Sequence, residues 1–248
     1  MVELYAVHAI WLREAKVFLR EKERIASSIL SPLLWLFIFG SGMGESISGD
    51  YRAFIFPGIL CMSVLFVSMF YGLYIIWDRR LDFLKEVLVA PVSRSSIFFG
   101  KVLGGVTDAM LHALFLLFIG AVFVIPISPS AFLLSLVFLF MIAFAMTGLG
   151  LIIGANMKSQ EGFSLVVNFV MWPMFFFSGA LFNISNLPSF LKPISSINPL
   201  TYGVDALRVI LLGSGSFPLI FDATVIFLFI IITSVIGVFS FGSLQQAK

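Results

Sequence analysis

Two ionisable side chains lie inside one of the long apolar stretches of the sequence. Asp108 and His112 are four residues apart, so on a helix they share one face. An ionisable group within a membrane-spanning helix is a functional candidate by default, because its burial in lipid is costly. Two interpretations stay open: a polar pair that is satisfied against a neighbouring helix, or a pair that takes part directly in a transport path.

The motifs of common hydrolytic enzymes are absent from the chain. The sequence has no Gly-x-x-x-x-Gly-Lys-Ser/Thr phosphate loop, no His-Glu-x-x-His and no Gly-x-Ser-x-Gly. Cys61 is the single cysteine, so no internal disulfide can form, and no Cys/His spacing suits a metal ion. We therefore expect no catalytic residue, no metal site and no hydrolysis of ATP by this chain alone.

The composition indicates an integral membrane protein. Hydrophobic residues make up 60% of the 248 residues and charged residues only 11%, whereas an ordinary soluble domain has about 25% charged residues. A surface this apolar is suited to lipid rather than to water. The net charge of +2 gives no indication of a nucleic-acid partner. We expect one transmembrane permease domain over residues 1–248.

Long apolar runs predict an all-α membrane protein with six spans. The sixth run is separated from the fifth by residues 183–208, which are rich in proline yet fairly apolar, so we expect short re-entrant helices there. Asn198 is suited to cap a helix that begins at Pro199. The glycine pairs 40/44, 100/104 and 150/154 have the spacing of close helix packing. The predicted spans are 25–42, 53–77, 102–125, 131–155, 163–182 and 217–242.

The first 24 residues have the pattern of an amphipathic helix lying in the membrane interface. Its apolar positions recur at helical spacing and include Trp11 and Phe18, while Arg13 and Arg20 belong to a basic face. A plain cytoplasmic helical tail is the alternative. We expect an interfacial helix over residues 1–24, since a span follows it directly.

The distribution of lysine and arginine predicts the orientation. Loops on the two sides of the predicted membrane differ in their number of lysine and arginine residues. The side with more of these residues is normally cytoplasmic. Both termini and the loop 78–101 therefore face the cytoplasm, while Arg52, Lys192 and Arg208 lie on the other side. The basic residues of the cytoplasmic side are Arg13, Lys16, Arg20, Lys22, Arg24, Arg79, Arg80, Lys85, Arg94, Lys101, Lys158 and Lys248.

The loop between the second and third spans is predicted to dock a soluble partner. Leu84 and Leu88 share one face of a short helix that Pro91 ends. Arg80 and Glu86 can form charge-assisted contacts with a partner while the apolar ridge fills a groove. A simple solvated connector does not explain an apolar ridge that faces water.

Two stretches of the sequence resemble the permease subunits of type-2 ABC exporters, in particular the drug-resistance and lipo-oligosaccharide permeases. The first stretch runs from Asp78-Arg79-Arg80 through Glu86 to Ala90-Pro91-Val92-Ser93-Arg94. The second contains Phe177-Ser178-Gly179 and Leu187-Pro188, then Asn198-Pro199-Leu200-Thr201-Tyr202 and Asp205-Ala206-Leu207-Arg208. Together with the six spans, the resemblance covers nearly the whole chain.

The resemblance implies a subunit that works in an assembly. Two permease copies pair as a homodimer, and two copies of a separate subunit bind ATP and Mg²⁺ beneath them. Segment 81–90 becomes the coupling helix, with Arg80, Leu84, Glu86, Val87, Leu88, Pro91 and Arg94 as ATPase-coupling residues. Residues Asn198, Pro199, Tyr202, Asp205 and Arg208 belong to the outer re-entrant segment. The expected location is the cell membrane of a bacterium or archaeon.

An amphipathic or lipid-linked substrate, such as a glycolipid, a polysaccharide or a drug, suits the apolar spans. Besides Asp108 and His112, the aromatic residues Tyr74, Trp172 and Phe176 are candidates for the transport path, although they could equally face lipid. The alternative function is a self-sufficient channel or secondary transporter that uses Asp108 and His112. An intramembrane enzyme is less well supported, because it has only these two residues and Glu161 as candidate groups.

Overall fold

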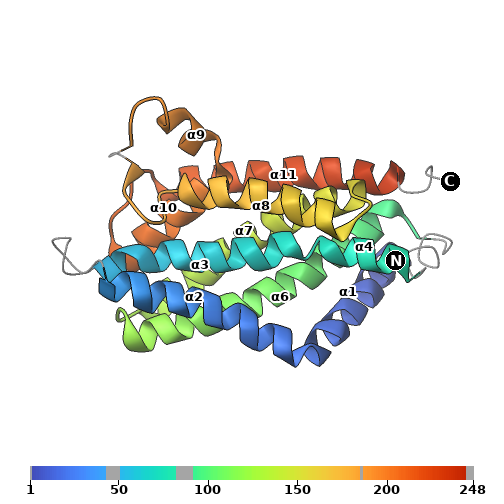
Figure 1. Cartoon of the computed structure of the whole chain (residues 1–248), viewed down its shortest axis with the longest axis horizontal. Helices are drawn as coiled ribbons and strands as arrows, with labels where there is room; N and C mark the ends of the chain where they lie inside the picture. The colour runs from blue at the N-terminus through green and yellow to red at the C-terminus, as the bar shows by residue number, and fades with distance from the viewer. Residues whose placement is uncertain (1, 43–50, 82–91, 185–186, 244–248) are drawn as a thin grey trace.

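The computed structural model describes residues 2–42, 51–81, 92–184 and 187–243, and within these ranges the chain is helical and has no strand (Figure 1). The α-helical class predicted from the sequence is therefore confirmed for the described residues. In chain order the helices are α1 (Val2–Arg20), α2 (Lys22–Gly42), α3 (Tyr51–Phe70), α4 (Leu73–Arg80), α6 (Arg94–Phe123), α7 (Pro129–Asn156), α8 (Gln160–Phe176), α9 (Lys192–Ile197), α10 (Pro199–Leu212) and α11 (Leu219–Ser243).

Capping side chains determine where several of these helices begin. The hydroxyls of Ser93, Ser128 and Ser159 each accept a hydrogen bond from the amide three residues later, at the starts of α6, α7 and α8. Asn198 does the same for the amide of Leu200, and Pro199 occupies the first position of α10, so the cap expected there is confirmed.

Four segments of the described chain are long and apolar enough to cross a membrane: Tyr51–Arg80, Arg94–Phe123, Pro129–Asn156 and Leu219–Ser243. The apolar part of α2, Leu30–Gly40, and the 17 residues of α8 are shorter. Successive long helices alternate in direction, and the start of α1 and the end of α11 lie at the same end of the bundle (Figure 1). Four of the six expected spans thus satisfy the criteria of length and apolarity.

Several helices begin or end at residues other than the bounds of the predicted spans, each for a local reason. Helix α6, which contains most of the predicted span 102–125, begins at Arg94, because Ser93 caps it there. Helix α8 ends at Phe176 rather than at 182, since Pro173 lies in its last turn and Gly179 then adopts a φ of +78°. The N-terminal helix ends at Arg20, and α2 begins at Lys22.

The second predicted span is one run of residues but two helices, α3 and α4. The break at Tyr71 and Gly72 lies where this segment crosses α7 at very short range. A Cβ atom on Gly72 would lie 2.0 Å from the carbonyl oxygen of Gly150, and one on Gly154 would lie 2.1 Å from that of Gly72. The close packing predicted at positions 150 and 154 is therefore confirmed, with backbone against backbone.

Helix α3 lies at the centre of the bundle, and α11 lies at its periphery. The apolar window of Tyr51–Arg80 is 78% buried, whereas that of Leu219–Ser243 is only 17% buried. Helix α3 contacts α2, α6, α7, α8 and α10. Large apolar side chains cover the outer surface, for example Phe118, Leu133 and Phe239. Such a surface is stable against lipid, so the structure is that of a membrane protein.

Candidate functional site

Helix α1 packs tightly along the first turns of α6. A Cβ atom on Gly100 would lie 2.8 Å from the Cβ of Ile10, and one on Gly104 would lie 2.6 Å from the Cβ of Glu14. The close packing expected at glycines 100 and 104 is confirmed: Gly100 packs against α1, and Gly104 packs against both α1 and the Tyr71 hydroxyl. This approach carries Glu14 into the bundle, where only 4% of the residue is exposed.

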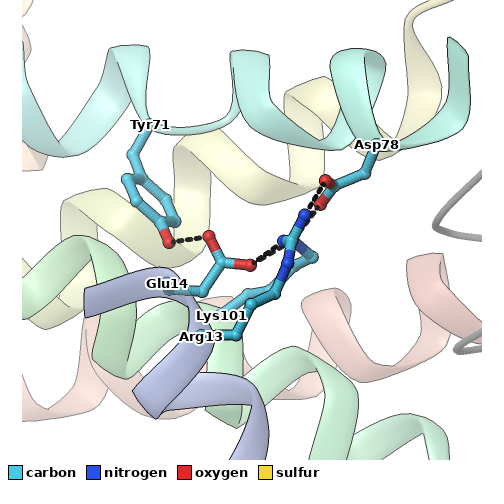
Figure 2. A network of polar contacts seen from close by, with 5 residues as sticks. All are labelled: Arg13, Glu14, Tyr71, Asp78 and Lys101. Carbon is cyan, nitrogen blue, oxygen red and sulfur yellow. Dashed lines mark hydrogen bonds and ion pairs between the residues drawn. The ribbon is translucent and has the colours of Figure 1, made fainter. Parts of the chain in front are cut away.

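Five side chains from three regions of the chain meet at this place and form an ionic cluster. Figure 2 shows the two cations between the carboxylates of Glu14 and Asp78. The Lys101 Nζ atom lies 3.0 Å from Glu14 Oε1 and also contacts Asp78 Oδ2. Arg13 bridges the same two carboxylates, with 2.7 Å to Glu14 Oε1 and 2.9 Å to Asp78 Oδ1. The Tyr71 hydroxyl donates to Glu14 Oε2 at 2.7 Å.

The cluster contains two cations and two anions, so its formal charges cancel. Lys101 is 1% exposed and Asp78 is 4% exposed. Burial opposes ionisation of Glu14, but the Lys101 ammonium and the Tyr71 hydroxyl outweigh it and hold the pKa of Glu14 below its usual range. A complete buried cluster contributes little net stability, yet loss of one partner leaves an uncompensated charge, which is strongly destabilising. The arrangement therefore requires all of its members.

Further hydrogen bonds attach α1 to both sides of residues 82–91. On the α4 side, the Tyr74 hydroxyl donates to Glu21 Oε2 at 2.5 Å. On the α6 side, the Trp11 indole donates to Thr107 Oγ1 at 2.9 Å, and Glu3 accepts from the hydroxyls of Ser93 and Ser96. Helix α1 thus connects the end of α4 with the start of α6.

Arg79 connects α4 to a further helix. Its guanidinium donates to the carbonyl oxygens of Ala155 and Met157, both at 2.9 Å, at the end of α7. Cations are favourable at a helix C-terminus, where the last carbonyl groups have no partner within the helix. Arg79 therefore joins α4 to the end of α7.

A family model of ABC-2 type transporters matches residues 5–212, which is most of the chain and includes the whole ionic cluster. The chain belongs to the ABC-2 type transporter family. The resemblance seen in the sequence is thus confirmed, and the protein is the membrane subunit of an ABC transporter.

Related permeases align with this ABC-2 chain over most of their length. It is 29% identical to the inner membrane transport permease YadH of Escherichia coli K12, over 93% of both chains. It is 28% identical to the putative transport permease ycf38 of Cyanophora paradoxa, over 84% of this chain and 76% of that one. It is 29% identical to nodulation protein J of Rhizobium meliloti, over 83% and 81%.

Two of the expected coupling residues of this ABC-2 permease lie within the described part of the chain. Arg80 is exposed in the last turn of α4, and Arg94 is the first residue of α6. The other coupling residues lie outside the described residues, and their role stays a prediction: Leu84, Glu86, Val87, Leu88 and Pro91.

The residues proposed for the transport path do not form one group. The His112 Nδ1 atom lies 3.1 Å from Asp108 Oδ1 and 2.8 Å from the Asp108 carbonyl oxygen, so this pair is a close contact within α6. Tyr74 instead contacts Glu21, the residue between α1 and α2. Trp172 and Phe176 stack on each other on α8, with ring centroids 5.7 Å apart, and Phe176 is 40% exposed.

The residues expected in the interfacial helix divide between the core and the surface. Phe18 is buried and meets the His112 ring at 6.1 Å between centroids, whereas Arg20 is exposed. Arg13 was predicted to lie on a basic face, but its guanidinium turns toward Asp78. Leu4, predicted to lie on the apolar stripe, is 75% exposed. The apolar stripe therefore packs against protein over its second half.

At the opposite end of the bundle, the charged residues of α10 bind backbone groups. Asp205 accepts from the amides of Ser216 and Phe217 at 2.8–2.9 Å, and Arg208 donates to the carbonyl oxygen of Gly179 at 2.9 Å. Asp205 and Arg208 are three residues apart on α10, yet each binds a different segment. The Tyr202 hydroxyl donates to the carbonyl oxygen of Ser196 at 2.7 Å.

Sequence reasoning missed Glu14 and Tyr71 and placed Asp78 and Lys101 in the cytoplasmic loop 78–101. One signal was available, because Glu14 lies four residues from both Ile10 and Phe18 and so occupies the apolar face of α1. An acidic residue at such a position needs a buried cation as its partner. No local pattern identifies Lys101 as that cation.

Proposed function

We propose that this chain is the membrane-spanning subunit of an ATP-driven exporter that moves an amphipathic or lipid-linked substrate outward. Glycolipids, polysaccharides and drugs are the candidate substrates. ATP and Mg²⁺ bind to two copies of a separate ATPase subunit, and a second permease copy completes a homodimer. The chain crosses the cell membrane of a bacterium or archaeon six times, with α2 and α8 as the two shorter spans and both termini in the cytoplasm.

The observation that supports this proposal best is the position of the ionic cluster. Asp78 precedes residues 82–91 and Lys101 follows them, and both side chains bind Glu14 or Arg13 of α1. Segment 82–91 therefore begins and ends at helices that are joined to each other through α1. In this proposal, a force applied to this segment by an ATPase acts on α4 and α6 together, because both helices are joined to α1.

The long helices convert this force into movement within the membrane. Helix α4 continues into α3 through the break at Tyr71 and Gly72, and Tyr71 itself binds Glu14. The break is the point at which the cytoplasmic part of the second span can change its angle relative to α3. In this proposal the apolar ridge of Leu84, Val87 and Leu88 receives the force, and the ionic cluster distributes it.

The test is co-purification of the tagged chain with its ATPase, followed by measurement of ATP turnover in lipid. We expect the double variant Leu84→Asp and Leu88→Asp to lose the ATPase, because two charges on the apolar ridge oppose its burial. The matched control is Phe190→Asp, which introduces a charge at a 73% exposed apolar position at the opposite end of the bundle. This control retains the ATPase.

Two results would contradict the proposal. One is isolation of the chain without any ATPase under mild detergents, which would favour the self-sufficient transporter that uses Asp108 and His112. The other is an ATPase that stays bound but shows no stimulation by any lipid, glycolipid or drug tested, which would contradict the substrate class.

A further inference from the structure

A cavity of about 200 Å³ lies between α2, α3 and α6, away from the ionic cluster. Ser63 on its wall is twelve residues from the start of α3, which corresponds to about 18 Å of helix and to the middle of the apolar span. The described residues that line the cavity are Ser31, Pro32, Met62, Ser63, Phe66, Val67, Phe70 and His112.

The cavity wall contains a buried hydroxyl without a partner. Ser63 is 1% exposed, and its Oγ atom forms no hydrogen bond within the described part of the chain. A buried polar group without a hydrogen bond costs about 1–3 kcal/mol. His112, which is 2% exposed, faces the same cavity, and its contact with Asp108 fixes the orientation of the ring. The cavity therefore offers hydrogen bonding within an otherwise apolar wall.

The lining limits the kind of molecule that can bind. None of the described lining residues is Asp, Glu, Lys or Arg, and a charged group at this depth of a membrane is costly without a counter-charge. The volume is below the roughly 300–1,000 Å³ of ordinary ligand pockets, so one slim chain fits better than a bulky headgroup. Aromatic and aliphatic side chains on α3 suit such a chain.

We propose that this cavity binds a neutral single-chain lipid whose hydroxyl or ester carbonyl group forms a hydrogen bond with Ser63, with His112 beside it. The chain of the lipid packs against Met62, Phe66 and Phe70. Ser31 is the exposed lining residue and marks the entrance from the α2 side.

Two contacts connect this cavity to the ionic cluster. The Phe18 ring, one helical turn after Glu14, packs edge to face against His112. Phe70, which lines the cavity, directly precedes Tyr71, which binds Glu14. A bound lipid therefore touches the side chains that support α1. A regulatory effect of this lipid on ATP turnover would rest on the proposed function, but its binding does not.

The experiment is photolabelling of the purified full-length chain, without ATPase or ATP, by a monoacylglycerol with a diazirine group on its chain. We expect labelled peptides from residues 62–70 of α3. Ser63→Ala should weaken this labelling about 3- to 10-fold, as expected for the loss of one hydrogen bond. Ser31→Phe, which fills the entrance, should abolish it.

Ser68→Ala is the matched control. Ser68 is also a buried serine of α3 whose hydroxyl forms no hydrogen bond, but it does not line the cavity. Because both alanine variants remove a buried hydroxyl without a partner, both should unfold at or above the wild-type temperature, and by similar amounts. A diazirine alkane without hydroxyl groups should label wild type and Ser63→Ala equally.

Equal labelling of the Ser63→Ala and Ser68→Ala variants by the monoacylglycerol would overturn the proposal. So would label spread over the exposed faces of α7 and α11, which would indicate general contact with lipid. Neither result bears on the ATPase, so the proposed function would remain to be judged by its own experiment.

Discussion

The two ends of the bundle stabilise their charged residues in different ways. At the end that contains α1 and α4, here called the ionic end, Glu14 and Asp78 bind side-chain cations from distant parts of the chain. At the opposite end, Asp205 and Arg208 bind backbone groups, 11 and 29 residues away in sequence. Side-chain pairs can separate and re-form as helices move, whereas backbone contacts of this kind fix a turn. The comparison suggests that the ionic end moves and the opposite end holds its shape.

The largest expected effect is at the ionic end. Lys101→Met leaves Glu14 and Asp78 with only Arg13 between them, so we expect a loss of about 3–5 kcal/mol in the free energy of unfolding, as for other broken buried pairs. Thermal unfolding in detergent measures it. The double variant Glu14→Gln and Lys101→Met restores the charge balance and should recover most of the stability.

The same double variant separates stability from coupling. It retains the Arg13–Asp78 pair and loses the ionic link from α1 to α6, while the hydrogen bonds of Trp11 and Glu3 to α6 remain. In a complex with its ATPase, it should hydrolyse ATP at the basal rate without stimulation by substrate. Normal stimulation in this variant would show that the ionic cluster serves stability alone.

A smaller effect is expected at the opposite end. Asp205→Ala removes the acceptor of the Ser216 and Phe217 amides, which should cost about 1.5–3 kcal/mol, the range for hydrogen bonds to charged groups. Substrate-stimulated ATP turnover per folded complex should stay at the wild-type level. If this variant uncouples turnover while Lys101→Met does not, the roles assigned to the two ends are reversed.

Acidification should act on α1 through Glu14. The pKa of Glu14 is lowered in the folded protein. Its ionised carboxylate therefore stabilises the fold fully above the ordinary pKa of 4.5, and this stabilisation is lost as the pH falls through the lower pKa of the folded protein. Hydrogen exchange of the α1 amides, corrected for the intrinsic pH dependence, should therefore become faster below about pH 4.5. The Glu14→Gln variant should lack this component, and an identical response in both proteins would exclude Glu14 as its source.

The smallest effect on the protein is expected from a labelling test, which measures only the accessibility of single cysteine side chains. In a Cys61→Ala background, Leu81→Cys and Ile197→Cys place single thiols at positions that are 76% and 83% exposed, one at each end. An impermeant maleimide applied to intact cells should label position 197 and not position 81, and it should reach both after lysis. Label at position 81 in intact cells would reverse the predicted orientation.

Much of the fold could be predicted because its signals are local. Apolar length locates the long helices, and Ser128 or Asn198 before a proline locates their starts. The break at Gly72 could not be predicted, since it depends on contact with Gly150, which is far away in sequence. Residues close in sequence thus determine where the helices lie, whereas a break within a helical run, such as that at Gly72, depends on contacts with residues far away in sequence.

The candidate site was harder to predict for the same reason. The acidic residue on the apolar face of α1 is visible in the sequence, but its cation, Lys101, lies 87 residues later. Lysine next to a predicted span is ordinarily solvated, so its charge gave no indication of burial. Lys101 differs from the other lysines in having glycines at 100 and 104 beside it, which allow α1 to pack closely against α6.

The long sequence separation within the ionic cluster also determines when it can form during biosynthesis. Glu14 leaves the ribosome early, and Lys101 follows 87 residues later, which is roughly 4–17 s at ordinary rates of translation. Until then α1 lacks its main cation and cannot take its final place. The insertion of the helix beginning at Arg94 therefore completes the assembly of the N-terminal half, and a nascent chain stopped before that point retains an exposed α1.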